Sequence, residues 1–409
     1  MKTRGRQHAM RTLVVLHSHA ASGPPQHVFS WLAPLAERGP LAAVVPAAGS
    51  AEDLYATIGT TAVLPYDPLT YPGRVAALGG YVAGLAADVR TFSRFMRRFR
   101  PDLVVVVTAA LPAALVATRL QRVPTVVFVG EILDKGYVIS RGRRLGAAAM
   151  TWLTGALADG VVCCSDAVGR QFAPRRRRLL TTIYPGVDGT HADGDGARFR
   201  AQHGLGDADP CLAVVGNVTP ARGQDVVIRA LPALRAEFPR IRCVIAGVPH
   251  QRAGDLAYRE ELATLARRLG VDDVVSFVGL VDPIADLYAA ADVVVNPVRV
   301  NESFGRVAVE ALSAGCPVVA ARVGAIPEVV RDGREALLFE AGDHEALGEA
   351  VARLWRDRRL REHLVRNGRR RVATTFSESV AVEAFGDVVD RVLTARDRPR
   401  VTPAPATSR

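Results

Sequence analysis

The chain has 409 residues, 49% of them hydrophobic and 23% charged, which excludes a single compact core and predicts a soluble globular protein of two or three domains. No apolar run is long enough to cross a membrane, and the run behind the basic N-terminus is too short for a secretory signal, so we expect a cytoplasmic protein. The net charge of +11 comes from arginine, which falls in local runs, and most such runs are solvated faces of a protein. The functional alternative is an acidic partner, for which peripheral contact with an anionic membrane is a better prediction than nucleic acid, because no nucleic-acid-binding module is recognisable.

The first half of the chain alternates Val- and Leu-rich runs with helical stretches. The runs lack strict polar alternation, as expected of parallel strands that are covered on both faces. Strands are expected at residues 13–16, 42–46, 103–108, 125–129, 160–164 and 180–184, and helices at 26–38, 80–99, 111–121 and 147–157. This alternation predicts an α/β domain with a doubly wound parallel sheet, which we place at residues 1–188.

The second half repeats this pattern after a glycine-rich stretch that we interpret as a linker at residues 189–210. Strands are expected at residues 211–216, 242–246, 274–277, 293–296, 318–320 and 336–339, and helices at 224–237, 255–269, 283–290, 304–314, 326–330, 343–355 and 361–376. We place a second doubly wound domain at residues 211–378, a final helix that packs back on the first domain at 379–395, and a disordered tail at 396–409. Two Rossmann-like domains of this kind face each other across a cleft where ligands bind.

Two carboxylates, Glu302 and Glu310, flank a small-residue turn that opens a helix. Glu302 falls in the loop, and Glu310 falls on the helix about two turns in. The free N–H groups of the helix start favour an anion between the two acids. This arrangement suits a ligand with hydroxyl groups at both ends and phosphate in the middle, which describes a nucleotide-sugar. The alternative is an ordinary surface helix with two solvated acids.

Two further features follow strands of the second half. The loop at residues 216–225 places Arg222 at the start of the next helix, where a guanidinium can pair with phosphate. Gly247 follows the next strand, and its missing side chain lets a ligand approach the backbone. Because carboxyl ends of parallel strands share one edge of the sheet, these residues and the two glutamates predict a single ligand site.

The motifs of the second half resemble those of the retaining glycosyltransferases of family 4. The resemblance is dense between residues 214 and 342 and rests on the segments 215–225, 277–279, 287–293, 302–305, 310–311, 314–319 and 324–328. It implies the two-domain GT-B architecture and a nucleotide-diphosphate sugar that is held mainly by the second domain. It also implies an acceptor hydroxyl and requires neither a cofactor nor a catalytic metal.

The resemblance assigns separate contacts to the two carboxylates. Glu302 would contact the hydroxyls of the donor sugar, and Glu310 would contact the ribose diol. The turn and helix start between them would offer donor-binding backbone groups at Ser303, Phe304, Gly305, Arg306 and Val307.

The phosphate-binding loop departs from the family pattern at two positions. Arg222 stands where the family usually has lysine, and we expect it to stabilise the leaving diphosphate, so that Glu302 and Arg222 are the predicted catalytic residues. Asn217 stands where an arginine is frequent and is the predicted donor contact there. One cation of the clamp is therefore missing or supplied from elsewhere, for example by Arg306.

The first half lacks a histidine that many members carry after the fourth strand, facing the transferred sugar. Residues 128–132 of this chain contain none, and Glu131, His19 and His27 are the acceptor-side candidates to replace it. Gly23, in the loop after the first strand, matches the glycine-rich turn that approaches the donor phosphate.

The sequence as a whole predicts a retaining glycosyltransferase that uses a nucleotide-diphosphate sugar. The acceptor hydroxyl would belong to a lipid-linked molecule, a glycan or a small natural product. A catalytically silent sugar-nucleotide binder, or a membrane-associated scaffold, is the alternative that the missing histidine and Asn217 leave open.

Overall fold

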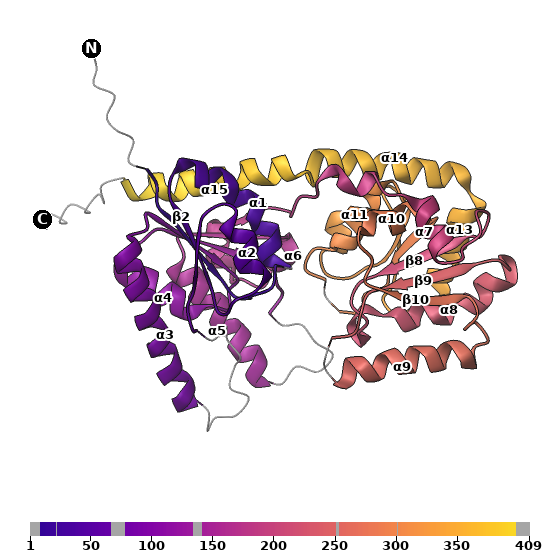
Figure 1. Ribbon diagram of the computed structural model, residues 1–409, viewed down its shortest axis with the longest axis horizontal. Helices are drawn as coiled ribbons and strands as arrows, with labels where there is room; N and C mark the ends of the chain where they lie inside the picture. Colours follow the sequence, from indigo (N-terminus) through magenta and orange to yellow (C-terminus); the bar gives the residue numbers. More distant parts are fainter. Residues whose placement is uncertain are drawn as a thin grey trace, which may run out of the picture.

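The computed structural model describes residues 9–21, 23–66, 78–133, 141–250, 253–300 and 302–397. They form two α/β domains, each built around its own parallel sheet (Figure 1). Helices α14 (Arg358–Thr375) and α15 (Glu378–Asp397) run along both domains. The prediction of two Rossmann-like, doubly wound domains is confirmed.

The first sheet has seven parallel strands in the order β3-β2-β1-β4-β5-β6-β7. Their bounds are β1 Thr12–Leu16, β2 Leu41–Val45, β3 Thr60–Val63, β4 Leu103–Val107, β5 Thr125–Val129, β6 Gly160–Cys163 and β7 Leu180–Thr182. Strands β1, β2, β4, β5 and β6 are buried along their whole length, because helices cover both faces of the sheet. This double coverage explains why their sequences are almost uniformly aliphatic.

Helices of unequal length cover the first sheet. They are α1 Pro24–Arg38, α2 Ser50–Ala56, α3 Leu78–Phe99, α4 Pro112–Gln121, α5 Arg141–Leu157, α6 Asp166–Gly169 and the 3-10 helix η2 Pro174–Leu179. Helices α3, α4 and α5 lie together on one side of the sheet, and α1 and α15 lie on the other (Figure 1). Trp31 of α1 contacts Phe128 of β5 and Phe385 of α15, at ring-centroid distances of 5.3 and 5.6 Å. The last helix is therefore part of the core of the first domain.

The second sheet has six parallel strands in the order β10-β9-β8-β11-β12-β13. The strands are β8 Cys211–Val215, β9 Arg242–Ala246, β10 Val275–Gly279, β11 Val293–Asn296, β12 Val318–Ala321 and β13 Leu337–Phe339. The helices are η4 Pro220–Arg222, α8 Gln224–Glu237, α9 Ala253–Arg268, α10 Ile284–Ala290, α11 Arg306–Ala314, α12 Ile326–Val329 and α13 His344–Arg356. One hydrophobic core joins α8, α9 and α13 to this sheet, and another extends from the first domain to α10 and α11.

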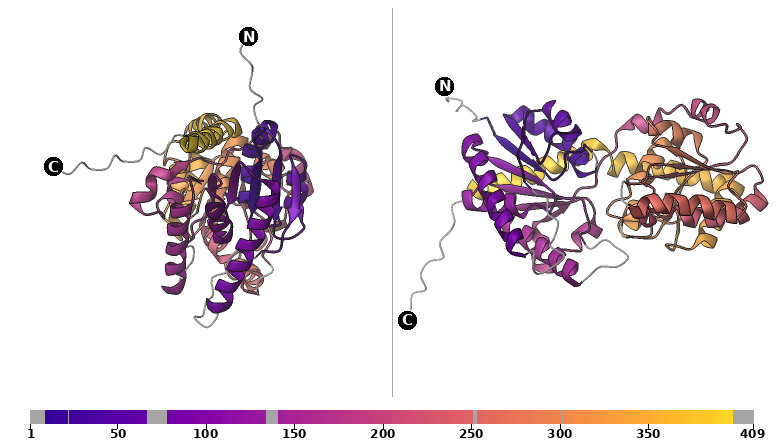
Figure 2. Two further views of the ribbon diagram at one scale, coloured as in Figure 1. Left: turned by 90° about the vertical axis from the view of Figure 1, so that its left-hand side faces the viewer. Right: turned by 60° about the horizontal axis from the view of Figure 1, so that its bottom comes forward.

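The segment that we interpreted as a linker contains two ordered elements, η3 (Gly189–Ala192) and α7 (Gly196–Gln202). Both pack against α10, and η3 also packs against α11. Arg198 of α7 forms an ion pair with Asp286 of α10. The chain between the two sheets is thus fixed to the second domain, and Figure 2 shows the two domains from two further sides.

The sequence prediction omits β3 and α2 in the first domain. Strand β3 is four residues long, lies at the edge of the sheet and is partly exposed, so it lacks the apolar run that marks the other strands. Helix α15 continues to Asp397, and the tail expected beyond it lies outside the described residues from 398 onward. None of the described helices combines the length and the apolar character needed to cross a membrane.

Candidate functional site

The predicted ligand-binding edge of the second sheet lies where its strand order reverses, between β8 and β11. Two loops flank this point: residues 216–223 follow β8, and residues 297–300 and 302–305 follow β11. They approach closely at Gly223, whose φ is +71° and where a Cβ atom would lie 2.1 Å from the carbonyl oxygen of Pro297. Glycine is therefore needed there for both its conformation and its size.

Arg222 and Glu302 face each other from these two loops. Nη1 of Arg222 donates to Oε2 of Glu302 at 2.8 Å, and the backbone N–H of Ser303 donates to Oε1 at 3.1 Å. The side chains are 36% exposed for Arg222 and 15% exposed for Glu302, so solvent reaches the pair. The structure brings together the two residues predicted to be catalytic, in an ion pair that the sequence does not reveal.

Helix α11 begins directly after this pair. Gly305 precedes it with a φ of +94°, and a Cβ atom there would lie 2.4 Å from Cδ1 of Ile326. The backbone amides of Arg306 and Val307 occupy the first turn, where a helix has no carbonyl partners of its own for its N–H groups. The predicted helix start thus exists, two residues later than the sequence indicates.

The turn before α11 is held by the first domain. The carbonyl oxygen of Ser303 accepts a hydrogen bond from the hydroxyl of Ser165 at 2.6 Å, and Sγ of Cys164 lies 3.4 Å from it. Because Ser165 and Cys164 follow β6, the carboxyl edge of the first sheet positions the loop of the second.

Phe304, the next residue of the turn, has a buried side chain that is 4% exposed. Its ring lies 6.2 Å from that of Tyr184 and 5.9 Å from that of Phe376, measured between centroids. The side chain therefore anchors the turn between the two domains, and only its backbone groups are left for the predicted contact with a donor.

Glu310 lies on α11 and is only 6% exposed. Its Oε2 accepts a hydrogen bond from the hydroxyl of Tyr288 at 2.7 Å, and its Oε1 accepts one from Nε of Arg306. Burial, and then the Glu310 charge, hold the pKa of Tyr288 well above its usual value, so the phenol stays a donor. Both carboxylates of the predicted site are thus paired with an arginine.

Arg306 also reaches across to the first domain. Its Nη1 lies 3.2 Å from Oε1 of Gln26 and 3.3 Å from Nε2 of His27, both in α1. Burial, and then the positive charge of Arg306, lower the pKa of His27 to about 3, so this imidazole is neutral at physiological pH. Of the three acceptor-side candidates, His27 is brought to the second domain in this way.

The other candidates in the first domain have local partners. His19 is exposed, and its carbonyl oxygen accepts a hydrogen bond from the backbone N–H of Ala51 at 2.9 Å. Gly23 has a φ of +62° and precedes α1, and the space around it would admit a Cβ atom without contact. Its conformation therefore requires glycine, whereas its surroundings do not.

The carboxylate of Glu131 forms hydrogen bonds with the loops that follow two strands of the first sheet. It accepts hydrogen bonds from the hydroxyl of Thr108, from the backbone N–H of Ala109 at 3.0 Å and from the backbone N–H of Gly130 at 3.0 Å. The side chain thus accepts three hydrogen bonds and stabilises the loops after β4 and β5.

Asn217 and Gly247 lie in neighbouring loops of the second sheet. Nδ2 of Asn217 lies 3.3 Å from Nε2 of His250. Gly247 has a φ of +137°, and a Cβ atom there would lie 2.1 Å from the carbonyl oxygen of Gly216. The glycine therefore lets the two loops approach each other, in addition to any approach by a ligand.

His191 is a candidate site residue that sequence reasoning missed. Its Nε2 lies 3.7 Å from Oε1 of Glu310, and its Nδ1 lies 3.5 Å from Oδ1 of Asp188. It belongs to η3, inside the segment interpreted as a linker, and nothing in the linear sequence indicates that this segment returns to α11.

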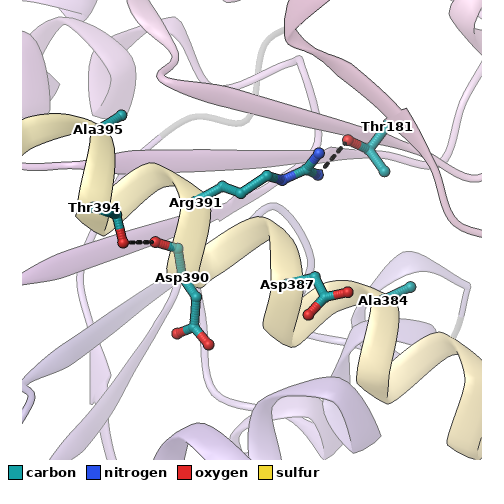
Figure 3. Close-up of a pocket in the computed structure, with 7 residues that line it drawn as sticks. All are labelled: Thr181, Ala384, Asp387, Asp390, Arg391, Thr394 and Ala395. Carbon is teal, nitrogen blue, oxygen red and sulfur yellow. Dashed lines mark hydrogen bonds between the residues drawn. The ribbon is translucent and has the colours of Figure 1, made fainter.

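A cavity of about 340 Å³ lies beside Arg306, His27 and His191 and is lined by both domains and the segment between them. A second cavity, of about 760 Å³, lies between β7 and α15 in the first domain and contains none of the predicted site residues (Figure 3). There, Nη2 of Arg391 donates to Oγ1 of Thr181 at 3.0 Å. We therefore place the candidate site at the Arg222–Glu302 pair, the start of α11 and the interdomain cavity that Arg306 lines.

Two Rossmann-like domains, with paired arginines and glutamates at the strand-order reversal of the second, define a protein of the GT-B class. Residues 195–371 match the family model of group 1 glycosyl transferases, and residues 14–190 match that of glycosyltransferase family 4. The chain belongs to the family 4 type of GT-B glycosyltransferases.

Curated relatives match part of the chain. D-inositol 3-phosphate glycosyltransferase 2 of Catenulispora acidiphila is 42% identical over 180 residues, which are 43% of this chain and 42% of the relative. D-inositol 3-phosphate glycosyltransferase of Actinosynnema mirum is 40% identical over 193 residues, 46% of each chain. The matches thus span less than half the length of these relatives.

Solved structures match nearly the whole chain. Anabaena HepE, crystallised in complex with UDP, has a TM-score of 0.78 at 23% identity, covering 93% of this chain and 100% of that one. Sucrose-phosphate synthase from Thermosynechococcus elongatus has a TM-score of 0.72 at 22% identity, covering 94% and 100%. At these identities the likeness concerns the fold.

Proposed function

We propose that the protein transfers a sugar from a nucleotide-diphosphate sugar to an acceptor hydroxyl, with retention of the anomeric configuration. The observation that supports this most directly is the pairing of Glu302 with Arg222 and of Glu310 with Arg306 on either side of the α11 start. Two carboxylates that accept hydroxyl hydrogen bonds, separated by cationic and N–H groups, match the polarity of a nucleotide-sugar from end to end.

In this proposal the arginines occupy the carboxylates while the donor is absent. Donor hydroxyls replace one hydrogen bond on each acid, and the guanidinium of Arg222 turns to the diphosphate that lies between them. The exchange keeps both carboxylates satisfied, and an unsatisfied buried carboxylate would oppose binding. Glu302 holds the transferred sugar and Glu310 holds the ribose.

For the chemical step we propose a front-face displacement. The acceptor oxygen forms a bond to the anomeric carbon while the bond from that carbon to the diphosphate oxygen breaks. The hydroxyl proton passes to the leaving diphosphate, whose developing charge Arg222 and the amides of α11 stabilise. The step as proposed uses protein groups and the substrates, with no metal ion or cofactor.

The donor and acceptor can be ranked for testing. HepE has been solved with UDP-glucose, which makes UDP-sugars the first donors to test on this chain. The relatives named D-inositol 3-phosphate glycosyltransferase make inositol phosphate the first small-molecule acceptor to test. Lipid-linked and glycan acceptors follow.

The proposal is tested by thermal unfolding in the presence of UDP-, GDP-, TDP- and ADP-sugars. We expect the sugars of one nucleotide to raise the unfolding temperature of the wild type. Glu310→Gln should bind them at least tenfold more weakly, so that a tenfold higher concentration is needed for the same shift, because the ribose contact is lost. Glu340→Gln, at a side chain that is 75% exposed, is the matched control and should bind as the wild type does. Equal binding by all three proteins would remove Glu310 from the site.

A silent sugar-nucleotide binder is the alternative that two observations favour. Glu131 is occupied by three hydrogen-bond donors, and Asn217 provides no charge for the diphosphate. Slow release of nucleoside diphosphate from the donor, without acceptor, separates the two functions. We expect release with the wild type, whereas a silent binder would show a thermal shift and no release.

A further inference from the structure

We propose that the outer face of α4, α5 and η2 binds the surface of an anionic membrane. We call this surface the α5 face, and it consists of Arg119, Leu120, Arg144, Leu145, Trp152, Arg175, Arg177 and Arg178. The inference does not depend on the proposed transfer reaction, because none of these residues belongs to the candidate site.

Large apolar side chains are exposed on the α5 face. Leu145 is 73% exposed, Trp152 is 62% exposed, and Leu120 at the end of α4 is 69% exposed. On α5 the exposed residues Leu145, Ala148, Ala149 and Trp152 follow the spacing of one helical stripe. Leucine and tryptophan on such a stripe are the side chains that enter the boundary between head groups and acyl chains.

The orientation of α5 is fixed by its opposite face. Ala147, Met150 and Thr154 are buried beneath the helix, at exposures of 7%, 6% and 0%. The packing of these residues determines which side of α5 points outward. The exposed stripe is therefore a stable surface of the folded protein.

Positive charge surrounds the stripe. Helices α4, α5 and η2 contain one, three and four arginines, respectively, and no aspartate or glutamate. Helix η2 lies beside α5: a Cβ atom placed at Gly155 of α5 would be 3.2 Å from Cγ of Arg176 in η2. Within the described ranges, no ion pair is formed by Arg119, Arg144, Arg175, Arg177 or Arg178.

An acidic side chain approaches this region at one end. Asp159 lines a cavity of about 460 Å³ together with Arg119, Arg178 and Arg391. Its carboxylate accepts a hydrogen bond from the backbone N–H of Thr125 at 2.9 Å, so it serves the start of β5. Three guanidinium groups and one carboxylate line this cavity, and Asp387 and Asp390 line the neighbouring cavity that shares Arg391.

The combination of groups favours a lipid surface over other acidic partners. A nucleic acid would be bound by cations along a groove with aromatic rings for stacking, whereas here a single tryptophan and two leucines are exposed among arginines on the outer side of helices. An anionic leaflet attracts arginines close to its surface and admits the apolar side chains between head groups. The α3–α4–α5 layer lies on the side of the first domain away from α15 (Figure 1), so that helix does not cover its outer face.

The proposal is tested by co-sedimentation of the full chain with vesicles of phosphatidylcholine alone and of phosphatidylcholine with phosphatidylglycerol at a ratio of 7:3. We expect binding to the anionic vesicles only, with an affinity that falls as salt is added. Arg175→Glu/Arg177→Glu should weaken binding at least tenfold, since each arginine near a leaflet contributes roughly fivefold. Arg358→Glu/Arg366→Glu on α14 makes the same change in charge at side chains 81% and 67% exposed, and should bind within about twofold of the wild type.

The apolar part is tested on the intact protein by tryptophan fluorescence with brominated lipid. Trp152 should be quenched on anionic vesicles, and Trp152→Phe should lose that quenching. Equal weakening by both double variants, or no quenching of Trp152, would overturn the proposal. Sedimentation velocity tests whether the α5 face is instead an interface between two copies of the chain. If the wild type is a dimer and Leu145→Ser/Trp152→Ala is a monomer, the membrane proposal is overturned.

Discussion

At the scale of single residues, the most informative feature is that each predicted acid of the donor site has an arginine as its partner. Arg222 and Arg306 come from different elements, yet each neutralises one glutamate of the pair on either side of the α11 start. The two arginines do not have equal roles, since Arg306 also contacts α1 and Arg222 lies at the strand-order reversal. Substitutions can separate these roles.

Arg222→Ala should lower kcat and nucleotide affinity together, reducing kcat/KM by about 10- to 100-fold, as expected for a charge-assisted hydrogen bond of about 1.5–3 kcal/mol. Steady-state kinetics with the donor identified by thermal shift would measure this. Arg235→Ala removes an arginine that pairs with Asp273 at 2.6 Å outside the site, and its kinetics should match the wild type. Normal kinetics for Arg222→Ala would show that the leaving group is stabilised elsewhere.

His27 should make stability depend on pH. Its pKa is about 3 in the folded protein, against about 6.5 in an unfolded chain, so the unfolded state binds the proton first as pH falls. Stability is therefore complete above pH 6.5 and decreases as pH falls from there toward 3, by up to about 2 kcal/mol at pH 5. Urea unfolding at pH 7 and pH 5 should show a smaller loss for His27→Gln than for the wild type. Identical losses would show that His27 is accessible and titrates normally.

At the scale of elements, the loops at the carboxyl ends of β8 and β9 owe their positions to glycine. Gly247→Ala should lower stability strongly, because the new Cβ atom would lie 2.1 Å from a backbone oxygen at a φ of +137°. Gly333→Ala is the matched control, since Gly333 also has a positive φ, of +67°, but has open space around it. Thermal unfolding should show a clearly larger decrease for Gly247→Ala, and a decrease equal to that of the control would mean that the loops can separate without cost.

The sequence is sufficient to predict most elements and to predict that the main residues of the candidate site lie together. Aliphatic runs mark the buried strands, and the order of strands and helices predicts that Arg222, Glu302 and Glu310 share one edge of a parallel sheet. Strand β3 is not predicted from the sequence, because an edge strand needs no apolar run. His191 and Tyr288 are not predicted as neighbours of Glu310, because their contact with it depends on how η3 and α10 pack on α11. No local sequence pattern encodes that packing.

At the scale of the whole molecule, contacts between the domains hold the donor-side turn. Phe376→Ala should lower stability by about 3–5 kcal/mol, since the ring is fully buried, and should also weaken donor binding, because Phe304 packs against it. Leu364→Ala removes an equally buried side chain from the core of the second domain alone. Calorimetric unfolding and donor titration should show destabilisation in both variants and weaker binding only for Phe376→Ala. Unchanged binding by a folded Phe376→Ala protein would mean that the turn keeps its position without this ring.

The place of α15 has a consequence for synthesis on the ribosome. Trp31 of α1 contacts Phe385 of α15. Gly160 of β6 lies against Val392 of α15, because a Cβ atom at Gly160 would lie 3.0 Å from Cγ2 of Val392. The segment that completes the first-made domain is thus translated after every other described helix. While the second domain emerges and folds, the nascent first domain exposes an apolar strip along α1, β5 and β6. That strip stays exposed to solvent until the last helix leaves the exit tunnel and covers it.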